Sequence, residues 1–211
     1  MSGLAQSRRR FVKPLAIGLG GLLLVVGLVI SGWLLWSIFR PPPDGFGPTV
    51  GEAKGDVDGS TNVLRYTIDA RSRESWAYFD FSRGAAVDAS RESLDWDLAF
   101  RRTVILTNSG DTSPEGFGGA VDLGEAPLGE AIPPSEGYLV DVTDEERGVE
   151  NPDLHRWYSY NWTTHIVSSK NHTYALHTAT GETVLLTFLS YYCDDGSPAC
   201  VTFQYTFPAD P

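Results

Sequence analysis

The feature that most constrains this chain is a run of 25 residues, from Leu15 to Phe39, that contains no charged side chain. As an α-helix rising 1.5 Å per residue, such a run is about 37 Å long, which is enough to cross a bilayer with some tilt. A cleaved secretory signal has a shorter apolar stretch, roughly 7 to 15 residues, followed by a small-residue cleavage site. The sequence therefore predicts one uncleaved transmembrane α-helix, a signal anchor, over residues 14–40.

The charges around this run predict its orientation. Four basic side chains precede it, at positions 8–10 and 13, and one, Arg40, follows it. Basic residues flanking a membrane helix stay on the cytoplasmic side. Residues 1–13 are therefore expected to form a basic cytoplasmic tail, and the rest of the chain to be exported, which in a bacterium means a single-pass protein of the inner membrane with a periplasmic domain. Both cysteines lie far downstream, at Cys193 and Cys200, which excludes a lipid anchor next to the helix.

Small residues gather on one face of the predicted helix. At about 100° per residue, Ala16, Gly20, Gly27 and Ser31 fall within roughly 60° of one another. Such a face allows close approach of a second helix, so it predicts docking against another integral membrane protein. The alternative is chance, because glycine is common in membrane helices.

The chain changes character after the predicted helix. Prolines and glycines at residues 41–60 predict a short spacer, and residues 61–211 predict one domain. Residues 41–211 carry 11 basic and 27 acidic side chains, a formal charge of −16. A domain of this charge repels nucleic acid, which is excluded as a partner.

Short β-branched and aromatic runs, bounded by turn-forming residues, predict an all-β antiparallel domain. Strands are expected near Asn62–Ile68, Trp76–Phe81, Leu94–Leu106, Arg156–Asn161, His172–Thr178, Thr183–Tyr192 and Val201–Phe207. The last three form a predicted meander, with a tight turn at residues 179–181. The segment Asn108–Asn151, which is rich in glycine and proline, is expected to form ordered loops with short strands.

The third expected strand shows alternation most clearly. Trp96, Leu98 and Phe100 share one face, whereas Asp95, Asp97 and Arg101 share the other. Alternation of this kind predicts a strand buried on one side and exposed to solvent on the other.

Cys193 and Cys200 flank a loop of sequence CDDGSPAC between the last two expected strands. Closing so short a loop is geometrically easy and stabilises the fold by roughly 2 to 3 kcal/mol in a chain-entropy model. An exported domain lies in an oxidising compartment, so the sequence predicts a disulfide. The alternative is a pair of buried free thiols.

Catalytic signatures are weak throughout the sequence. No convincing nucleophile with its base, set of spaced metal ligands or phosphate loop is present, so an enzyme is not expected. All four histidines, His155, His165, His172 and His177, nevertheless lie within 23 residues. His172 and His177 have opposite parity along a strand and should face opposite sides of a sheet. His172 could instead meet His165 or His155 across neighbouring segments; the alternative is four separate surface histidines.

Several stretches then follow in a familiar order: SWAYFDFSRGAAVD, DWDLAFRRTVILTNSG and GFGGAVDLG, and a C-terminal third that begins RWYSYNWTTH and ends in an aromatic strand. From Ser75 to Pro208 the chain resembles the HmuY family of bacterial haem-binding proteins. The resemblance implies an HmuY-like all-β fold, no catalysis, and a haem held by two axial side chains, His with His or His with Met. Met1 is the only methionine, so a haem in this chain requires two histidines, or a Tyr or Cys substitute.

Two functions remain. In the first, the protein is a non-enzymatic accessory or scaffold subunit of a bacterial membrane complex, such as a photosynthetic or respiratory electron-transfer assembly. Its helix and exported domain would then contact integral membrane subunits. In the second, it binds haem or another tetrapyrrole itself through two histidines, with His172 joined by His165 or His155. A transmembrane anchor argues against a released haem scavenger in either case.

Overall fold

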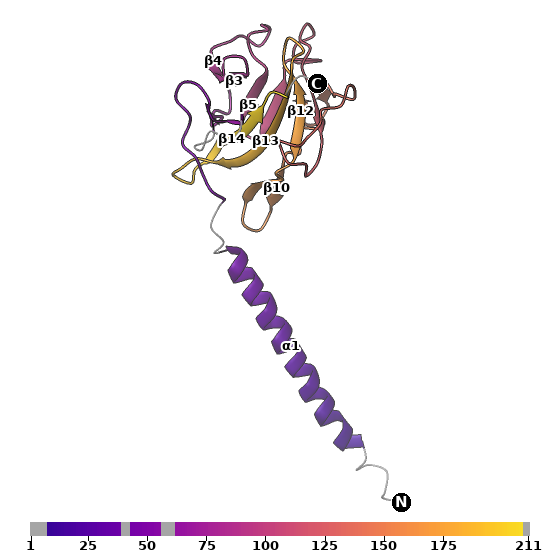
Figure 1. Ribbon diagram of the computed structural model, residues 1–211. Helices are drawn as coiled ribbons and strands as arrows, with labels where there is room; N and C mark the ends of the chain where they lie inside the picture. The colour runs from indigo at the N-terminus through magenta and orange to yellow at the C-terminus, as the bar shows by residue number, and fades with distance from the viewer. Residues whose placement is uncertain (1–7, 39–42, 56–61, 209–211) are drawn as a thin grey trace, which may run out of the picture. The chain divides into compact units, whose positions relative to one another are not determined.

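The computed structural model describes residues 8–38, 43–55 and 62–208, and within the helix it describes the side chains from residue 21 to residue 37. The chain divides into two compact units (Figure 1). One unit contains the helix, and also residues 162–165. The other contains the remainder of the β domain.

Helix α1, Arg8–Ile38, is a continuous helix of 31 residues. On the predicted docking face, Ser31 is exposed, and a Cβ built on Gly27 would have no neighbouring atom within 4 Å. Ala16 and Gly20 lie outside the described side chains. Within the described ranges, no helix combines the length and the apolar character that a membrane crossing requires. The membrane crossing and the helix-docking face therefore stay predictions.

The described part of the domain is built from β-strands in several antiparallel sheets. The strands are β1 (Lys54–Gly55), β2 (Leu64–Asp69), β3 (Ala77–Asp80), β4 (Ala85–Val87), β5 (Leu98–Arg101), β6 (Val104–Thr107), β7 (Gly119–Asp122), β8 (Val142–Asp144), β9 (Gly148–Glu150), β10 (Tyr158–Asn161), β11 (Ile166–Ser169), β12 (Thr173–His177), β13 (Thr183–Tyr192) and β14 (Pro198–Thr206). A six-stranded sheet has the order β1-β2-β14-β13-β12-β7, and a four-stranded sheet has the order β4-β3-β5-β6. The pairs β8–β9 and β10–β11 form separate hairpins. The predicted all-β fold is confirmed.

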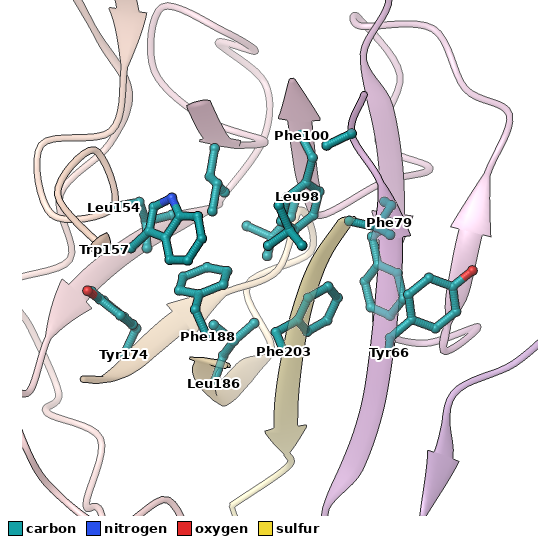
Figure 2. Packing of buried hydrophobic residues seen from close by; sticks show 14 of the residues in the cluster. Tyr66, Phe79, Leu98, Phe100, Leu154, Trp157, Tyr174, Leu186, Phe188 and Phe203 are labelled. Atoms are coloured by element: carbon teal, nitrogen blue, oxygen red, sulfur yellow. The ribbon is translucent and has the colours of Figure 1, made fainter. Parts of the chain in front are cut away.

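The hydrophobic core lies between the two larger sheets, because alternate residues of each strand point inward. Phe203 of β14 illustrates the packing: its ring lies edge-on to Phe79 of β3 at 5.0 Å between centroids and stacks on Phe100 of β5 at 5.6 Å. Figure 2 shows these rings together with Phe188 and Trp157, which continue the same core toward β10. Alternating apolar positions in β2, β12, β13 and β14 supply the six-stranded side of this core.

The predicted meander is confirmed, since β12, β13 and β14 are neighbours in the sheet and β13 has the predicted bounds. The single strand predicted at Leu94–Leu106 is wrong. The chain turns back at Arg102, whose φ is 58°, so that β5 and β6 form a hairpin with Arg101 opposite Val104. No glycine, proline or asparagine marks this turn, and a left-handed arginine is not a sequence signal that favours one.

The segment expected to be a spacer lies partly against the domain. The Phe46 N–H donates to the Tyr192 carbonyl at 2.9 Å, and the Ala53 N–H donates to the Gly84 carbonyl at 2.6 Å. Gly45 approaches the chain so closely that an added Cβ would lie 1.9 Å from the Cys193 carbonyl oxygen. Residues 43–55 are thus held along the domain surface and end in strand β1.

The disulfide between Cys193 and Cys200 is confirmed, with the two Cα atoms 4.9 Å apart. It closes the β13–β14 hairpin directly beside the place where Gly45 packs. The bond therefore fixes both the loop and the point at which the chain enters the domain.

Asp97 is buried, which contradicts the expected solvent-facing side of the third strand. Its side chain is 6% exposed. One carboxylate oxygen accepts the N–H of Phe81 at 2.8 Å, and the other accepts the N–H of Ala179 at 2.8 Å. Because Phe81 follows β3 and Ala179 begins the β12–β13 turn, this carboxylate joins the four-stranded sheet to the six-stranded sheet.

A second buried carboxylate organises the glycine-rich middle of the chain. Asp141 accepts hydrogen bonds from the backbone and hydroxyl of Thr107, from the Thr112 hydroxyl at 2.7 Å and from the Asn151 amide at 3.1 Å. Burial raises its pKa, and these hydrogen bonds oppose that shift. Asn108 lies alongside, and its amide nitrogen donates to the carbonyls of Ser93 and Trp96. The hydrogen bonds of Asp141 and Asn108 therefore connect loops that lie far apart in the sequence.

The Asp97 carboxyl group should make stability depend on pH. Burial raises its pKa to about 6 from an ordinary 3.8, although the Phe81 and Ala179 N–H groups oppose the shift. The folded state then binds the proton more tightly, so the free energy of unfolding should fall by up to about 3 kcal/mol as the pH rises from about 4 to about 6. Asp97→Asn should flatten this slope, because the amide does not titrate.

Urea denaturation of the full chain in mild detergent, at several pH values across this window, measures the effect. Asp97→Asn should also be less stable than the parent at the acid end, because its amide nitrogen must face one of the two N–H donors. Asp95→Asn is the matched control, since Asp95 is exposed two residues away. An unchanged slope in Asp97→Asn would contradict the assignment.

Gly116 should not tolerate a side chain. A Cβ there would lie 2.0 Å from the Asn108 carbonyl oxygen, which is backbone and cannot move aside cheaply. Gly116→Ala should therefore destabilise the domain by at least about 2 kcal/mol, measured by chemical denaturation. Gly129→Ala is the control, because a Cβ at Gly129 would have no neighbour within 4 Å. Equal stability of the two variants would contradict the close contact between Gly116 and the Asn108 main chain.

Candidate functional site

His172 is the predicted site residue whose surroundings are best defined. It stands just before β12, and its Nδ1 lies 2.9 and 3.0 Å from the two carboxylate oxygens of Asp122 at the end of β7. The two strands are hydrogen-bonded neighbours, with Tyr174 opposite Asp122. Because a carboxylate can only accept, Nδ1 carries a proton, and in the neutral imidazole the lone pair then lies on Nε2. A carboxylate behind an imidazole in this way is typical of metal-ligating histidines.

Other groups hold Asp122 in place for this contact. Its Oδ1 also accepts the Gly124 N–H at 2.8 Å, and its own N–H donates to the Asp153 carboxylate at 3.0 Å. The side chains of His172 and Asp122 remain 24% and 31% exposed, respectively. His172 is thus fixed by a supported carboxylate while its ring stays accessible.

Tyr174 lies on the core side of the His172–Asp122 pair. Its ring centroid is 6.4 Å from that of His172, and the residue is buried in the core (Figure 2). Burial raises the pKa of its hydroxyl, and the nearby Asp122 and Asp153 carboxylates raise it further. Tyr174 therefore stays protonated and supplies an aromatic wall beside the imidazole.

His177 ends the same strand and has different surroundings. Its ring stacks on Tyr138 at 3.6 Å between centroids, with 16° between the planes. Burial lowers its pKa below the ordinary 6.5, so it is mostly neutral at pH 7. His172 and His177 are separated by the length of β12, about 16 Å. The two cannot ligate one metal ion, as their parity along the chain predicted.

His155 lies in the turn before β10, and both of its ring nitrogens face other groups. Nε2 accepts the Arg156 Nε–H at 3.1 Å, and Nδ1 is 3.3 Å from the Pro152 carbonyl oxygen. With its Nε2 lone pair directed at a guanidinium, His155 is a poor ligand.

His165 occupies the loop of the β10–β11 hairpin with a left-handed φ of 57°. It belongs to the unit that contains α1, whereas His172 belongs to the other unit. The pairing of His165 with His172 therefore stays a prediction. Within the described residues, no group of three or more His, Cys, Asp or Glu side chains could hold a metal ion.

Sequence reasoning missed Asp122, the most informative partner in this region. It lies 50 positions before His172 in the sequence. The only local signal was its place at the end of a short apolar run in GGAVDLG, where a strand gives way to a loop. Its contact with His172 depends on the pairing of β7 with β12, which the sequence alone did not predict.

Known structures share this architecture. A putative HmuY-like haem-binding protein from Bacteroides vulgatus matches with a TM-score of 0.60 and 19% identity, covering 77% of this chain and 100% of that one. The apo HmuY analogue of Tannerella forsythia matches at 0.56 and 18% identity, covering 77% and 99%. Apo PinO from Porphyromonas gingivitis matches at 0.55 and 19% identity, covering 70% and 98%. At these identities the likeness concerns the fold alone.

Among curated proteins, none matches this chain in sequence. A family model, by contrast, matches residues 72–205, which is more than half of the chain and nearly the whole β domain described above. That model is described as HmuY protein, so the resemblance noted in the sequence is confirmed and this chain belongs to the HmuY family.

Proposed function

We propose that this protein is a non-enzymatic haem- or tetrapyrrole-binding protein in which His172 is one axial ligand. The observation that carries the proposal is the Asp122 carboxylate behind His172 Nδ1, at 2.9 Å. It fixes the ring and leaves the Nε2 lone pair available for iron. Family membership supports the same reading, because the relative from Bacteroides vulgatus is described as a putative haem-binding protein.

The residues present fit a haem better than a bare metal ion. A bare ion needs three or four protein ligands, and the described residues offer no such cluster. A haem iron already has four porphyrin nitrogens and needs only one or two axial side chains. In this site His172 would bind iron through Nε2 while Asp122 holds the Nδ1 proton, and His165 is the proposed second ligand.

The location of the domain forms part of the proposal. We infer that α1 anchors the protein in the bacterial inner membrane with the β domain in the periplasm, on the strength of the uncharged run and the basic residues before it. A haem bound there would stay at the membrane surface. The alternative role, an accessory subunit of a membrane complex, is supported only by the small residues on one face of α1.

Replacing His172 tests the ligand directly. The full chain, purified in mild detergent and titrated with haemin, should show a Soret band of low-spin bis-histidine haem. His172→Ala should lose that spectrum and bind at least tenfold more weakly, because an axial bond is removed. His155→Ala is the matched control and should bind as the parent does, since its Nε2 faces Arg156. A parental spectrum in His172→Ala would refute the assignment.

Asp122 should tune the same site without touching the haem. Asp122→Asn keeps the shape but replaces a charged acceptor by a neutral one, which orients the His172 ring less firmly. Partners of this kind typically contribute 10- to 100-fold to metal affinity, so a loss within about that range is expected in the same titration. Asp95→Asn serves as the surface-charge control. Unchanged haemin affinity in Asp122→Asn would mean that the pair is only structural.

A further inference from the structure

The β10–β11 hairpin lacks charged residues although much of it is exposed, whereas the uncharged strands β13 and β14 are largely buried. Residues 157–169 contain no Asp, Glu, Lys or Arg, although residues 41–211 carry a formal charge of −16. Aromatic, hydroxyl and amide side chains take their place. Trp162 in the loop is 77% exposed, and Tyr160 near the end of β10 is 53% exposed. This hairpin of the acidic domain thus presents exposed aromatic rings with no Asp, Glu, Lys or Arg beside them in residues 157–169.

The stem of the hairpin is hydrogen-bonded along the second half of β13. The Val167 N–H donates to the Tyr192 hydroxyl at 3.0 Å, and the Ser169 hydroxyl donates to the Phe188 carbonyl at 2.6 Å. Tyr192 is the last residue of β13. The hairpin is therefore attached where β13 runs into the disulfide loop.

The chain enters the domain at this same end. The Phe46 N–H donates to the Tyr192 carbonyl at 2.9 Å, and the Ser190 hydroxyl donates to the Asp44 carbonyl. From the last residue of α1, Ile38, to Asp44 is six steps along the chain, at most about 22 Å even when fully extended. If α1 is anchored as proposed, chain length alone keeps this end of the domain near the bilayer surface.

We propose that the tip of the β10–β11 hairpin enters the headgroup layer of the membrane that holds α1. This inference rests on the anchoring proposed above and not on haem binding. Trp and Tyr favour that layer because one part of each ring system is apolar and another can hydrogen-bond. Anionic headgroups repel carboxylates, so a tip without acidic side chains can approach the headgroups more closely than the acidic parts of the domain can.

Site-specific fluorescence tests this on the full chain. Because both native cysteines are in the disulfide, Trp162→Cys can be labelled alone with an environment-sensitive dye such as NBD. Phe117→Cys is the matched control: Phe117 is an aromatic residue that is 70% exposed, and its N–H donates to Ala179 at the β12–β13 turn. That turn lies at the opposite end of the ten-residue β13, about 30 Å from Tyr192.

Each variant is reconstituted into liposomes of phosphatidylcholine and phosphatidylglycerol, floated on a density gradient, and then measured with doxyl-labelled quencher lipids. The proposal expects both variants to float, and the dye at position 162 to be blue-shifted and several-fold more strongly quenched than the dye at position 117. Flotation with equal, weak quenching at both positions would overturn the hairpin insertion and leave the anchor intact. Failure to float would overturn the anchor and the insertion together, while the haemin titration judges haem binding independently.

Discussion

The buried Asp97 carboxylate is the interaction on which the arrangement of the domain depends. It accepts the Phe81 N–H from one sheet and the Ala179 N–H from the other, and its own main chain hydrogen-bonds to Phe79 and Asn108. Aromatic packing between the sheets contributes apolar burial and preferred ring geometries, whereas a hydrogen bond fixes the positions of one particular donor and acceptor. Two N–H groups converging on one carboxylate permit a single register, so a group that is costly to bury gives the sandwich its alignment.

The residues that carry the family resemblance serve mainly this scaffold. Asp97 lies in the stretch DWDLAFRR, Asn108 lies in NSG, and Gly116 and Gly118 of GFGG pack directly on the Asn108 main chain. A Cβ at Gly118 would lie 2.7 Å from the Asn108 carbonyl oxygen. Asp97, Asn108 and these glycines therefore report the fold, whereas His165 and His172 lie in the C-terminal stretch of the resemblance.

Local patterns predicted the parts of the fold that depend on local chemistry. The exact bounds of β13, the meander and the Cys193–Cys200 bond followed from alternation, turn residues and a short loop. The reversal at Arg102 was not predicted because no turn-forming residue lies there. The turn instead depends on burial of Leu98 and Ile105 in the same core. In the candidate site, His172 was predicted, but its partner was not. The contact with Asp122 exists only because β7 and β12 pair across 50 residues.

The order of the six-stranded sheet has one more consequence, which concerns self-association. One border strand, β1, is only two residues long and carries a lysine, and beyond β7 on the other side the chain continues with a single bridge between Ala120 and Leu139. Among the described residues, neither border of this sheet offers a long row of unpaired backbone groups to another molecule. Proteins confined to a membrane surface collide far more often than the same number of molecules in solution. With both borders of the six-stranded sheet blunted, crowding would not favour joining of this sheet to its counterpart in a neighbouring copy.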